Sequence, residues 1–295
     1  MTPTTANLTL SLARSGGASL GLSLSTGPSM VPGVGSSAGT STAAGGGASR
    51  WAAAGLAGGT STAAGGGAST GPAGLAAAIL ARTPIQYLKL DETSGTSFAD
   101  SSGNGRDGTI GGTGVTLGAT VGAYVLPTFA TGITGHVNVY SAGLSGAFNG
   151  DEGAAVLLVR PANITAGTRH LLYLTTPLGM IIRVTQVGAT LIVRREDTNG
   201  TAQTLQAGAL TAGVVTFIGV KWSVANNSLS GVVGAAAIGA GASGLVTWAD
   251  TLSAALISGL LTTGTTARIA GNVGQLALFN TPSVDFAAIY AASGL

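Results

Sequence analysis

The sequence predicts a mainly β protein in which an antiparallel β-sandwich follows an extended N-terminal arm. Beyond residue 86, short apolar runs alternate with Gly, Asn, Asp, Thr and Pro, which is typical of many short strands joined by turns. Before that point the chain holds no Asp or Glu and consists mostly of Ala, Gly, Ser and Thr. With 295 residues, the chain is long enough for one large β domain and an appendage.

The first 86 residues predict an arm, because small side chains cannot build an ordinary globular core. The segment GTSTAAGGGAS occurs unchanged at 39–49 and at 59–69, and two copies are too few for a solenoid. Two interpretations stay open: a flexible Gly/Ser linker, or an arm that orders against neighbouring subunits, since Gly and Ala let backbones approach closely. We expect the second, with residues 1–86 serving attachment and oligomerisation.

Short elements are predicted inside the arm. Leucines alternate with polar residues at 8–12 and again at 20–24, which predicts two short strands with one apolar face. The run LAAAILAR at 75–82 predicts a short helix that follows Gly71-Pro72 and ends before Pro84. We expect this helix to join the arm to the body.

From residue 85 onward, the apolar runs are short and bounded by turn residues, as in a β-sandwich. The predicted strands are YLKL (87–90), HVNVY (136–140), AAVLLVR (154–160), HLLYL (170–174), MIIRVTQV (180–187), TLIVRRE (190–196), VVTFIGVKWSV (214–224), LSGVVG (229–234), ARIAG (267–271) and GQLALFN (274–280).

The stretch YLKLDETSGTSFADSSGNGRDGT, from Tyr87 to Thr109, combines a strand, a polar turn, a second strand and an Asp/Asn/Gly loop. With the later runs GHVNVY, AAVLLVRPA and GNVGQLALFNTPSVDFAAIYAASGL, it resembles the laminin G-like branch of the concanavalin A-like lectin/glucanase superfamily. The resemblance covers residues 87–295. It implies a jelly-roll sandwich with a closing strand and a terminal helix.

The loop at 100–107 is the first candidate site. Asp100 can accept hydrogen bonds from nearby backbone amides, while Gly103 and Gly105 permit positive φ, so these residues predict a polar tight turn. The alternative is a calcium site in which Asp100 and Asp107 supply oxygens, as in some proteins with this fold. No other cofactor is expected.

Aromatic residues are the candidates for ligand contact. Trp248 lies in a Thr/Ala/Asp loop and could stack on a sugar ring, with Tyr140 beside a neighbouring polar loop. Trp222 is expected in the core, and Trp51 could anchor the arm on a partner subunit. His170 begins an apolar strand, where it is either a polar strand end or part of a ligand patch.

The chain is not expected to be an enzyme. Its acidic pairs at 91–92, 151–152 and 196–197 are adjacent residues, whose side chains point to opposite faces of a strand. Glycan hydrolases of this sandwich class need two carboxylates facing the same sugar.

Composition excludes further classes. The formal charge of +2, from 12 basic and 10 acidic residues, is too slight to predict a nucleic-acid partner. Absence of cysteine excludes disulfides and thiolate metal sites. No apolar run approaches the roughly 20 residues of a membrane-spanning helix, and the N-terminus lacks the apolar core of a secretory signal.

Two functions remain. The first is a non-enzymatic virion structural protein of a tailed bacteriophage, such as a head fibre, decoration protein or tail-associated fibre, which binds other virion subunits through residues 1–86. The alternative is a glycan-binding adhesin or receptor-recognition module that acts at the cell surface or outside the cell on a cell-surface glycan. Both imply a homo-oligomer, with a trimer as the first arrangement to test.

Overall fold

The computed structural model describes residues 71–295 except 131–133, 166, 209, 240 and 259–267. The repeats, the strands predicted at 8–12 and 20–24, and Trp51 therefore lie outside the described residues. The compact unit that contains the described residues runs from Gly67 to Leu295. It includes the helix at 72–80, which the sequence had grouped with the arm.

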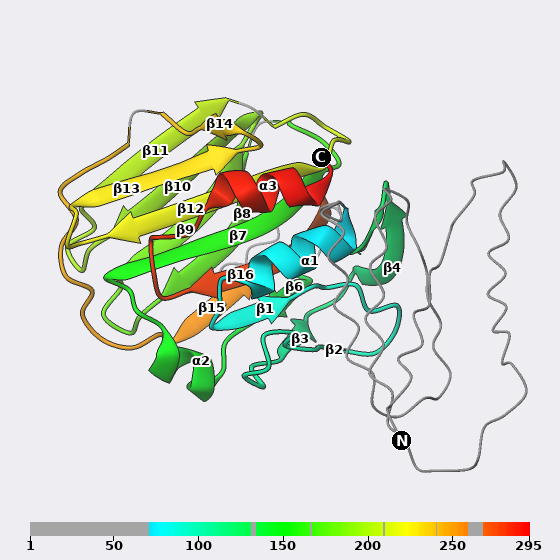
Figure 1. Ribbon diagram of the computed structural model, residues 1–295, viewed down its shortest axis with the longest axis horizontal. Helices are drawn as coiled ribbons and strands as arrows, with labels where there is room; N and C mark the ends of the chain where they lie inside the picture. Colours follow the sequence, from blue (N-terminus) through cyan, green and yellow to red (C-terminus); the bar gives the residue numbers. More distant parts are fainter. Residues whose placement is uncertain (1–70, 131–133, 166, 209, 240, 259–267) are drawn as a thin grey trace, which may run out of the picture. The chain divides into compact units, whose positions relative to one another are not determined.

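Two antiparallel sheets form a sandwich, as the sequence predicted (Figure 1). The first sheet has the strand order β14-β13-β12-β7-β16-β5-β4, and β1 also pairs with β16. Its strands are β1 (Gln86–Leu88), β4 (Val115–Val121), β5 (Tyr124–Phe129), β7 (Glu152–Pro161), β12 (Thr216–Ser223), β13 (Ser228–Val233), β14 (Ala236–Ala237) and β16 (Gly271–Phe279).

The second sheet has the strand order β11-β10-β9-β8-β15-β6-β3-β2. Neighbours are again antiparallel throughout the described residues. Its strands are β2 (Ser97–Phe98), β3 (Gly108–Gly111), β6 (His136–Asn138), β8 (Thr168–Thr175), β9 (Ile181–Val187), β10 (Thr190–Glu196), β11 (Ala202–Gly208) and β15 (Ala254–Ile257).

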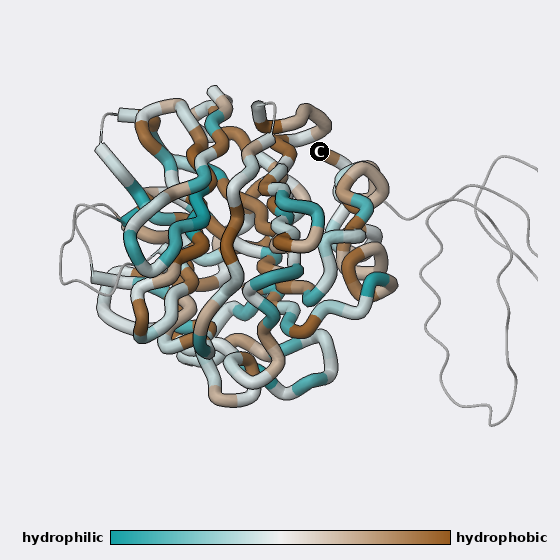
Figure 2. Tube along the Cα trace, turned by 90° about the vertical axis from the view of Figure 1, so that its left-hand side faces the viewer, coloured by the Kyte–Doolittle hydropathy of each residue, from teal (hydrophilic) through white to brown (hydrophobic). Residues whose placement is uncertain are grey.

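The main core lies between the sheets, because alternate side chains of each strand point inward. Leu157 and Val220 of the first sheet, and Val184 and Val193 of the second, are fully buried in it. Trp222 is also fully buried there. In Figure 2, brown hydrophobic and teal hydrophilic segments alternate along the trace of the folded body.

A second core lies on the outer face of the first sheet, where two helices pack: α1 (Pro72–Leu80) and α3 (Phe286–Ser293) (Figure 1). Leu75 and Ile79 of α1, and Ile289 of α3, are fully buried. Pro72 suits the first turn of α1 because its missing N–H has no intrahelical partner there. Asp285 caps α3 by accepting a hydrogen bond from the amide of Ala288 at 3.1 Å.

A third helix, α2 (Ala142–Ala147), and the segment between β14 and β15 close one end of the sandwich. Leu144 of α2, together with Leu245 and Leu252 of that segment, joins the core between the sheets. Ser141 begins α2 by accepting a hydrogen bond from the amide of Leu144 at 3.0 Å.

All the predicted strand runs except the one at 267–271 contain strands. That run contributes only Gly271 to β16 and a single bridge between Arg268 and His170. Strand β2 is the second strand predicted in the stretch 87–109. Strands β3, β4, β5, β11, β14 and β15 were not predicted, because their sequences carry Gly, Thr, Ala or Pro in place of clear apolar alternation. No helix among the described residues is long and apolar enough to cross a membrane.

Candidate functional site

The Asp100 carboxylate holds together the loop that the sequence singled out. Its Oδ1 accepts hydrogen bonds from the amides of Tyr87 and Ser102, and its Oδ2 accepts one from the amide of Arg106, all at 2.9 Å. Burial alone would raise the pKa of Asp100, but the hydrogen bonds from these groups outweigh it and hold that pKa below its ordinary value. The arrangement joins the loop to β1.

The glycines of this loop have the backbone geometry that a tight turn needs. Gly103 has φ of 84° and Gly105 has φ of 67°, and L side chains rarely adopt either value. Asp107 accepts the amide hydrogen of Asp100 through Oδ1 at 2.8 Å.

The loop does not fit a calcium ion. The Asp100 oxygens accept three amide hydrogens, which leaves only about one of the roughly four lone-pair positions of this carboxylate for a cation. The part of the chain that the structure describes contains no group of three His, Cys, Asp or Glu residues able to hold a metal. The geometry of Asp100 and Asp107 therefore does not support the calcium site that the sequence offered as an alternative.

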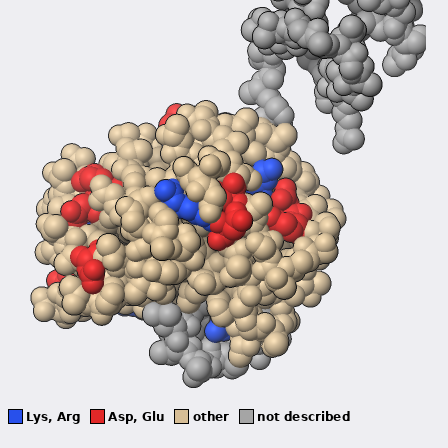
Figure 3. All heavy atoms as spheres, turned by 90° about the horizontal axis from the view of Figure 1, so that it is seen from below, with Lys and Arg blue, Asp and Glu red and all other residues tan. Residues whose placement is uncertain are grey.

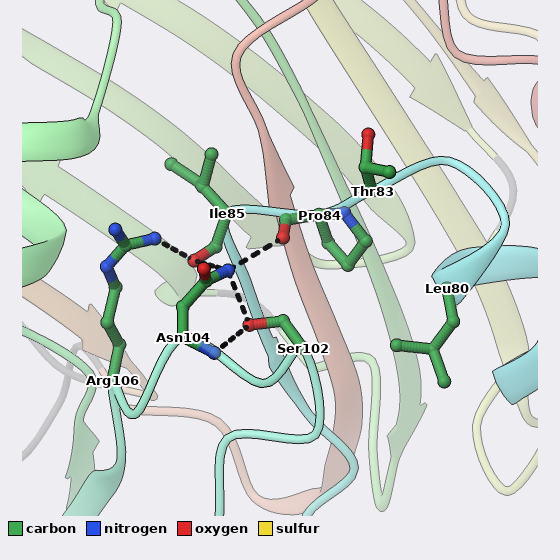
Figure 4. Close-up of a pocket in the computed structure, with 7 residues that line it drawn as sticks. All are labelled: Leu80, Thr83, Pro84, Ile85, Ser102, Asn104 and Arg106. Carbon is green, nitrogen blue, oxygen red and sulfur yellow. Dashed lines mark hydrogen bonds between the residues drawn. The ribbon is translucent and has the colours of Figure 1, made fainter.

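A shallow hollow of about 420 Å³ lies between this loop and the end of α1 (Figure 4). Its polar groups mainly bind the surrounding backbone. Asn104 Nδ2 donates to the carbonyl oxygens of Pro84 and Ile85, each at 3.2 Å, and the Arg106 guanidinium also donates to Ile85. The hollow thus marks where the loop is tied to the chain leaving α1. Its lining is Leu80, Thr83, Pro84, Ile85, Ser102, Asn104 and Arg106.

Trp248 lies at the closed end of the sandwich. Its indole contacts Gly150 so closely that a Cβ there would sit 2.0 Å from Trp248 Cγ. Phe148 meets the ring edge-on with centroids 5.9 Å apart, and the guanidinium carbon of Arg195 lies 5.5 Å from the ring centroid. The amide of Trp248 donates to Asp151. These contacts make Trp248 a cover over Arg195.

Arg195 is a buried cation, with 2% of its side chain exposed. Burial lowers its pKa, while nearby carboxylates, Asp151 first, oppose that shift. Its Nη2 donates to the carbonyl oxygen of Gly150 at 3.1 Å and lies 3.6 Å from Asp151 Oδ1. The Trp248 ring thus adds a cation–π contact to a cation that has few other partners.

Tyr140, the other predicted ligand residue, is half-buried against the core between the sheets. Its amide donates to Asn138 Oδ1 at 3.1 Å. Within the described ranges, no hydrogen bond or ring contact joins Tyr140 to Trp248. A ligand site that uses both residues stays a prediction.

A different set of polar side chains gathers on the outer face of the second sheet. The register places Tyr173 opposite Arg183, and Arg183 opposite Arg194, on strands β8, β9 and β10. Their sequence neighbours Val184 and Val193 point into the core, so these three side chains point outward. We call Tyr173, Arg183, Arg194, Glu196 and His170 the arginine–tyrosine face.

Glu196 lies between the two arginines of this face. It contacts Arg183 Nη2, and it lies 3.3 Å from Arg194 Nε. The arginine side chains are 20% and 34% exposed, whereas Glu196 is 12% exposed. The arginine side chains are therefore the part of the face that solvent reaches most.

Tyr173 and His170 form the more buried side of the face. Their rings meet edge-on with centroids 5.8 Å apart, and they are 7% and 4% exposed. Burial, and then the nearby charge of Arg183, lowers the pKa of His170 to about 4. No hydrogen-bond partner reaches His170 Nδ1 among the residues that the structure describes.

The same row continues with smaller residues on both sides. Thr204 of β11 is opposite Arg194, while Leu256 of β15 is opposite Tyr173 and Asn138 of β6. The row thus combines hydroxyl, guanidinium, phenol, aliphatic and amide groups on one surface.

Sequence reasoning missed this face, although alternation in MIIRVTQV and TLIVRRE could have placed Arg183, Arg194 and Glu196 on one side of their strands. The pairing register was needed to bring them together with Tyr173. His170 was weighed as a ligand residue, but without the partners that the fold supplies.

Charged side chains are sparse elsewhere on the surface. Figure 3 shows one face of the molecule on which blue and red atoms lie close together near the centre, red atoms gather with little blue at the left, and most of the surface is uncharged. This distribution agrees with the slight formal charge of +2.

No protein-family model and no curated protein sequence matches the chain. Solved structures do match its fold. The receptor-binding domain of botulinum neurotoxin C/D mosaic serotype is similar with a TM-score of 0.57 and 8% identity, over 72% of this chain and 51% of that one. The botulinum neurotoxin type G receptor-binding domain gives 0.54 and 10% identity, over 71% and 50%.

The botulinum neurotoxin serotype D ligand-binding domain, solved in complex with N-acetylneuraminic acid, gives a TM-score of 0.55 and 11% identity, over 74% of this chain and 52% of that one. At such identities the likeness shows the β-sandwich fold alone. The chain spans about half the length of these neurotoxin domains.

Proposed function

We propose that this protein is a non-enzymatic recognition module that binds a cell-surface glycan through the arginine–tyrosine face. The observation that carries the proposal is a row of five side chains at paired positions of neighbouring strands. They are Thr204 on β11, Arg194 on β10, Arg183 on β9, Tyr173 on β8 and Leu256 on β15. Within this row the two arginines, whose side chains are 20% and 34% exposed, are polar groups that a ligand can reach.

The chemistry of the row suits a sugar. Guanidinium and amide groups donate hydrogen bonds to sugar oxygens, and the free carboxylate oxygen of Glu196 accepts them from sugar hydroxyls. Tyrosine and leucine add the apolar contact that the carbon-bound hydrogens of a sugar ring can use. A rigid sheet also holds these groups at fixed spacing, which lowers the entropy cost of binding.

The fold neighbours support this function more than a virion role. Two of them are receptor-binding domains, and the serotype D ligand-binding domain was solved with N-acetylneuraminic acid. By analogy of fold, we propose that the present chain also acts outside a cell or at a cell surface.

The carboxylates support a non-enzymatic role. Glu196 is engaged by Arg183 and Arg194, and Asp151 by the amide of Trp248. Glu152 accepts hydrogen bonds from the Ser223 hydroxyl at 3.0 Å and from a backbone amide. A paired acid and base that could flank a glycosidic bond would have to be freed from such partners.

A glycan array probed with the full chain tests the proposed function. We expect binding to a subset of glycans, and Arg183→Ala should weaken it by about tenfold, which corresponds to about 1.4 kcal/mol. Lys221→Ala is the matched control, because it removes a cation from the first sheet, where Lys221 lies over the Phe286 ring. Absence of binding to every glycan, or equal losses in both variants, would contradict the proposal.

A narrower hypothesis places this module on a virion. In it, a laminin G-like domain of concanavalin A type is displayed on a tailed bacteriophage as a head fibre, decoration protein or tail-associated fibre. Residues 1–86 would dock on other virion subunits, and the chain would form a homo-oligomer, with a trimer tested first. The combination of a low-complexity N-terminal arm suited to docking and a lectin-like sandwich suited to display supports this hypothesis.

Co-purification tests the virion hypothesis separately from glycan binding. The full chain and a chain starting at Gly67 would each be incubated with assembled particles of a candidate phage. Attachment of the full chain alone is the expected result, and failure of the full chain to attach would contradict the docking role of the arm. Light scattering of both chains gives the oligomer number.

A further inference from the structure

We propose that the arginine–tyrosine face selects sugars that carry a carboxylate, with the anion held by Arg183 and Arg194. This inference rests on the proposed glycan-binding function and names its ligand class. Uronic acids and N-acetylneuraminic acid share the required chemistry, which is one carboxylate on a sugar ring.

Two like charges lie side by side on the arginine–tyrosine face. Arg183 and Arg194 are directly opposite each other on antiparallel strands β9 and β10. Side chains at opposite positions have Cβ atoms only about 5 Å apart, and like charges at such positions are destabilising. A sheet stabilised only for folding would avoid this pair.

The arginine pair carries more positive charge than its one carboxylate partner neutralises. Glu196 contacts both guanidinium groups and supplies one negative charge against two positive ones. Arg169, on the same strand as Tyr173, is instead bound to Thr165 through its Nη atoms at 3.0 and 3.3 Å. The pair of arginines therefore retains one positive charge that a second carboxylate would balance.

The shape of the guanidinium groups also suits a carboxylate. An arginine offers several N–H donors in a planar fork that matches the two oxygens of a carboxylate. Arg183 meets Glu196 through Nη2 and Arg194 meets it through Nε, which leaves other donors of both forks for a ligand. Arg183 Nε and Arg194 Nε are buried and make no hydrogen bond among the described side chains and backbone groups, so the exposed 20% and 34% belong to the rest of the two side chains.

His170 supplies an independent observation of an unmet polar group beside the arginines. It is 4% exposed, and its Nδ1 has no partner within the described part of the chain. A buried unsatisfied polar atom is unfavourable, so a ligand hydroxyl that reached it would contribute to binding. Burial, and then the nearby charge of Arg183, lowers the pKa of His170 to about 4, so the ring is neutral at pH 7 and Nδ1 can accept or donate one hydrogen bond.

Matched ligand pairs test the inference with the full chain. Sialyllactose is compared with lactose, and an oligosaccharide of hexuronic acids is compared with its carboxyl-reduced form, by isothermal titration calorimetry. We expect at least one acidic ligand to bind about tenfold or more tightly than its neutral counterpart. Binding of that ligand should weaken as salt rises, because the exposed charges are screened.

Three variants assign the effect to the arginine pair. Arg194→Gln should reduce the affinity for the acidic ligand to that for the neutral one, and Arg194→Lys should recover only part of it, because lysine lacks the fork. Arg169→Gln carries the same charge change on β8 and should keep the preference. Removing one of two opposed arginines should not lower stability, so thermal unfolding of Arg194→Gln should match the parent protein.

The outcomes separate this inference from the function on which it rests. Equal binding of acidic and neutral sugars would overturn the carboxylate preference and leave glycan recognition standing. An equal loss in Arg169→Gln would also overturn it, because general charge would then explain the preference. Absence of binding to any sugar would overturn both. Whether sialyllactose or the hexuronic ligand responds identifies which acidic sugar the face takes.

Discussion

At the scale of single residues, one carboxylate joins three points of the chain. Asp100 accepts hydrogen bonds from the amides of Tyr87, Ser102 and Arg106, which lie on β1 and at two places in the loop. Hydrogen bonds to a charged group contribute more to stability than neutral ones. The residue type and the flanking glycines made a turn predictable from the sequence, but the bond to β1 was not.

Asp100→Asn should lower the free energy of unfolding at neutral pH by about 1 to 3 kcal/mol. The pKa of Asp100 is below its ordinary value of 3.8, so its contribution is present above that pH and is lost as the pH falls through the lower native value. Urea unfolding at pH 7 and pH 3 should show a smaller gap between parent and variant at pH 3. Asp91→Asn, at an exposed position, is the control. An equal gap at both pH values would contradict the assignment.

We expect a second pH dependence of the free energy of unfolding from His170, a base whose pKa is lowered in the folded protein. Its pKa is about 4 in the folded protein and 6.5 ordinarily, so the unfolded chain binds more protons between these values. The contribution of His170 to the free energy of unfolding should therefore fall as the pH drops from about 6.5 to about 4, and change little further below that. His170→Gln should remove this slope, whereas His136→Gln, which leaves His170 in place, should keep it.

At the scale of elements, the segment between β14 and β15 is fixed by the contact of Trp248 with Gly150. Gly150→Ala should lower the free energy of unfolding by about 1 to 3 kcal/mol, because the new Cβ would lie 2.0 Å from Trp248 Cγ. Gly146→Ala, in α2, is the matched control, since nothing lies within 4 Å of its Cβ position and alanine favours a helix by about 1 kcal/mol. Chemical denaturation of both variants would measure the difference. Equal effects would contradict the account of Trp248.

Elements were predictable where sequence alternation was strong and where turns were unambiguous. The runs at 180–187 and 190–196 show alternation that matches β9 and β10. The strands at 115–121 and 124–129 were missed, because Gly118 and Pro127 interrupt any apolar pattern and tertiary pairing overrides weak propensity.

The candidate site was less predictable than the fold for the same physical reason. Arg183 and Arg194 lie eleven residues apart in sequence, and only the hairpin register makes them direct neighbours. Tyr173 joins them through a second pairing, after an irregularity between His170 and Leu172 that shifts the register of β8. A one-residue error in either register would place these side chains on different faces.

At the scale of the whole molecule, α1 belongs to the folded body. Leu75→Ala and Ile79→Ala in the full chain should each lower the free energy of unfolding by about 2 to 5 kcal/mol, because both side chains are fully buried against the first sheet. Ala77→Ser, at an exposed position of the same helix, should change it by less than about 1 kcal/mol.

Deletions provide the second measurement of the same prediction. A chain starting at Gly67 keeps α1 and should retain the unfolding temperature of the full chain. A chain starting at Tyr87 loses α1 and exposes the apolar surface beneath it, so it should unfold at a lower temperature or aggregate. Equal unfolding temperatures for the two shortened chains would contradict the role of α1.

The packing of α1 also determines how a tethered molecule would be oriented. The chain enters the sandwich on the outer face of the first sheet, where α1 lies, and the arginine–tyrosine face is on the outer face of the second. A probe attached to the exposed side of α1 would therefore lie on the opposite side of the sandwich from the arginines.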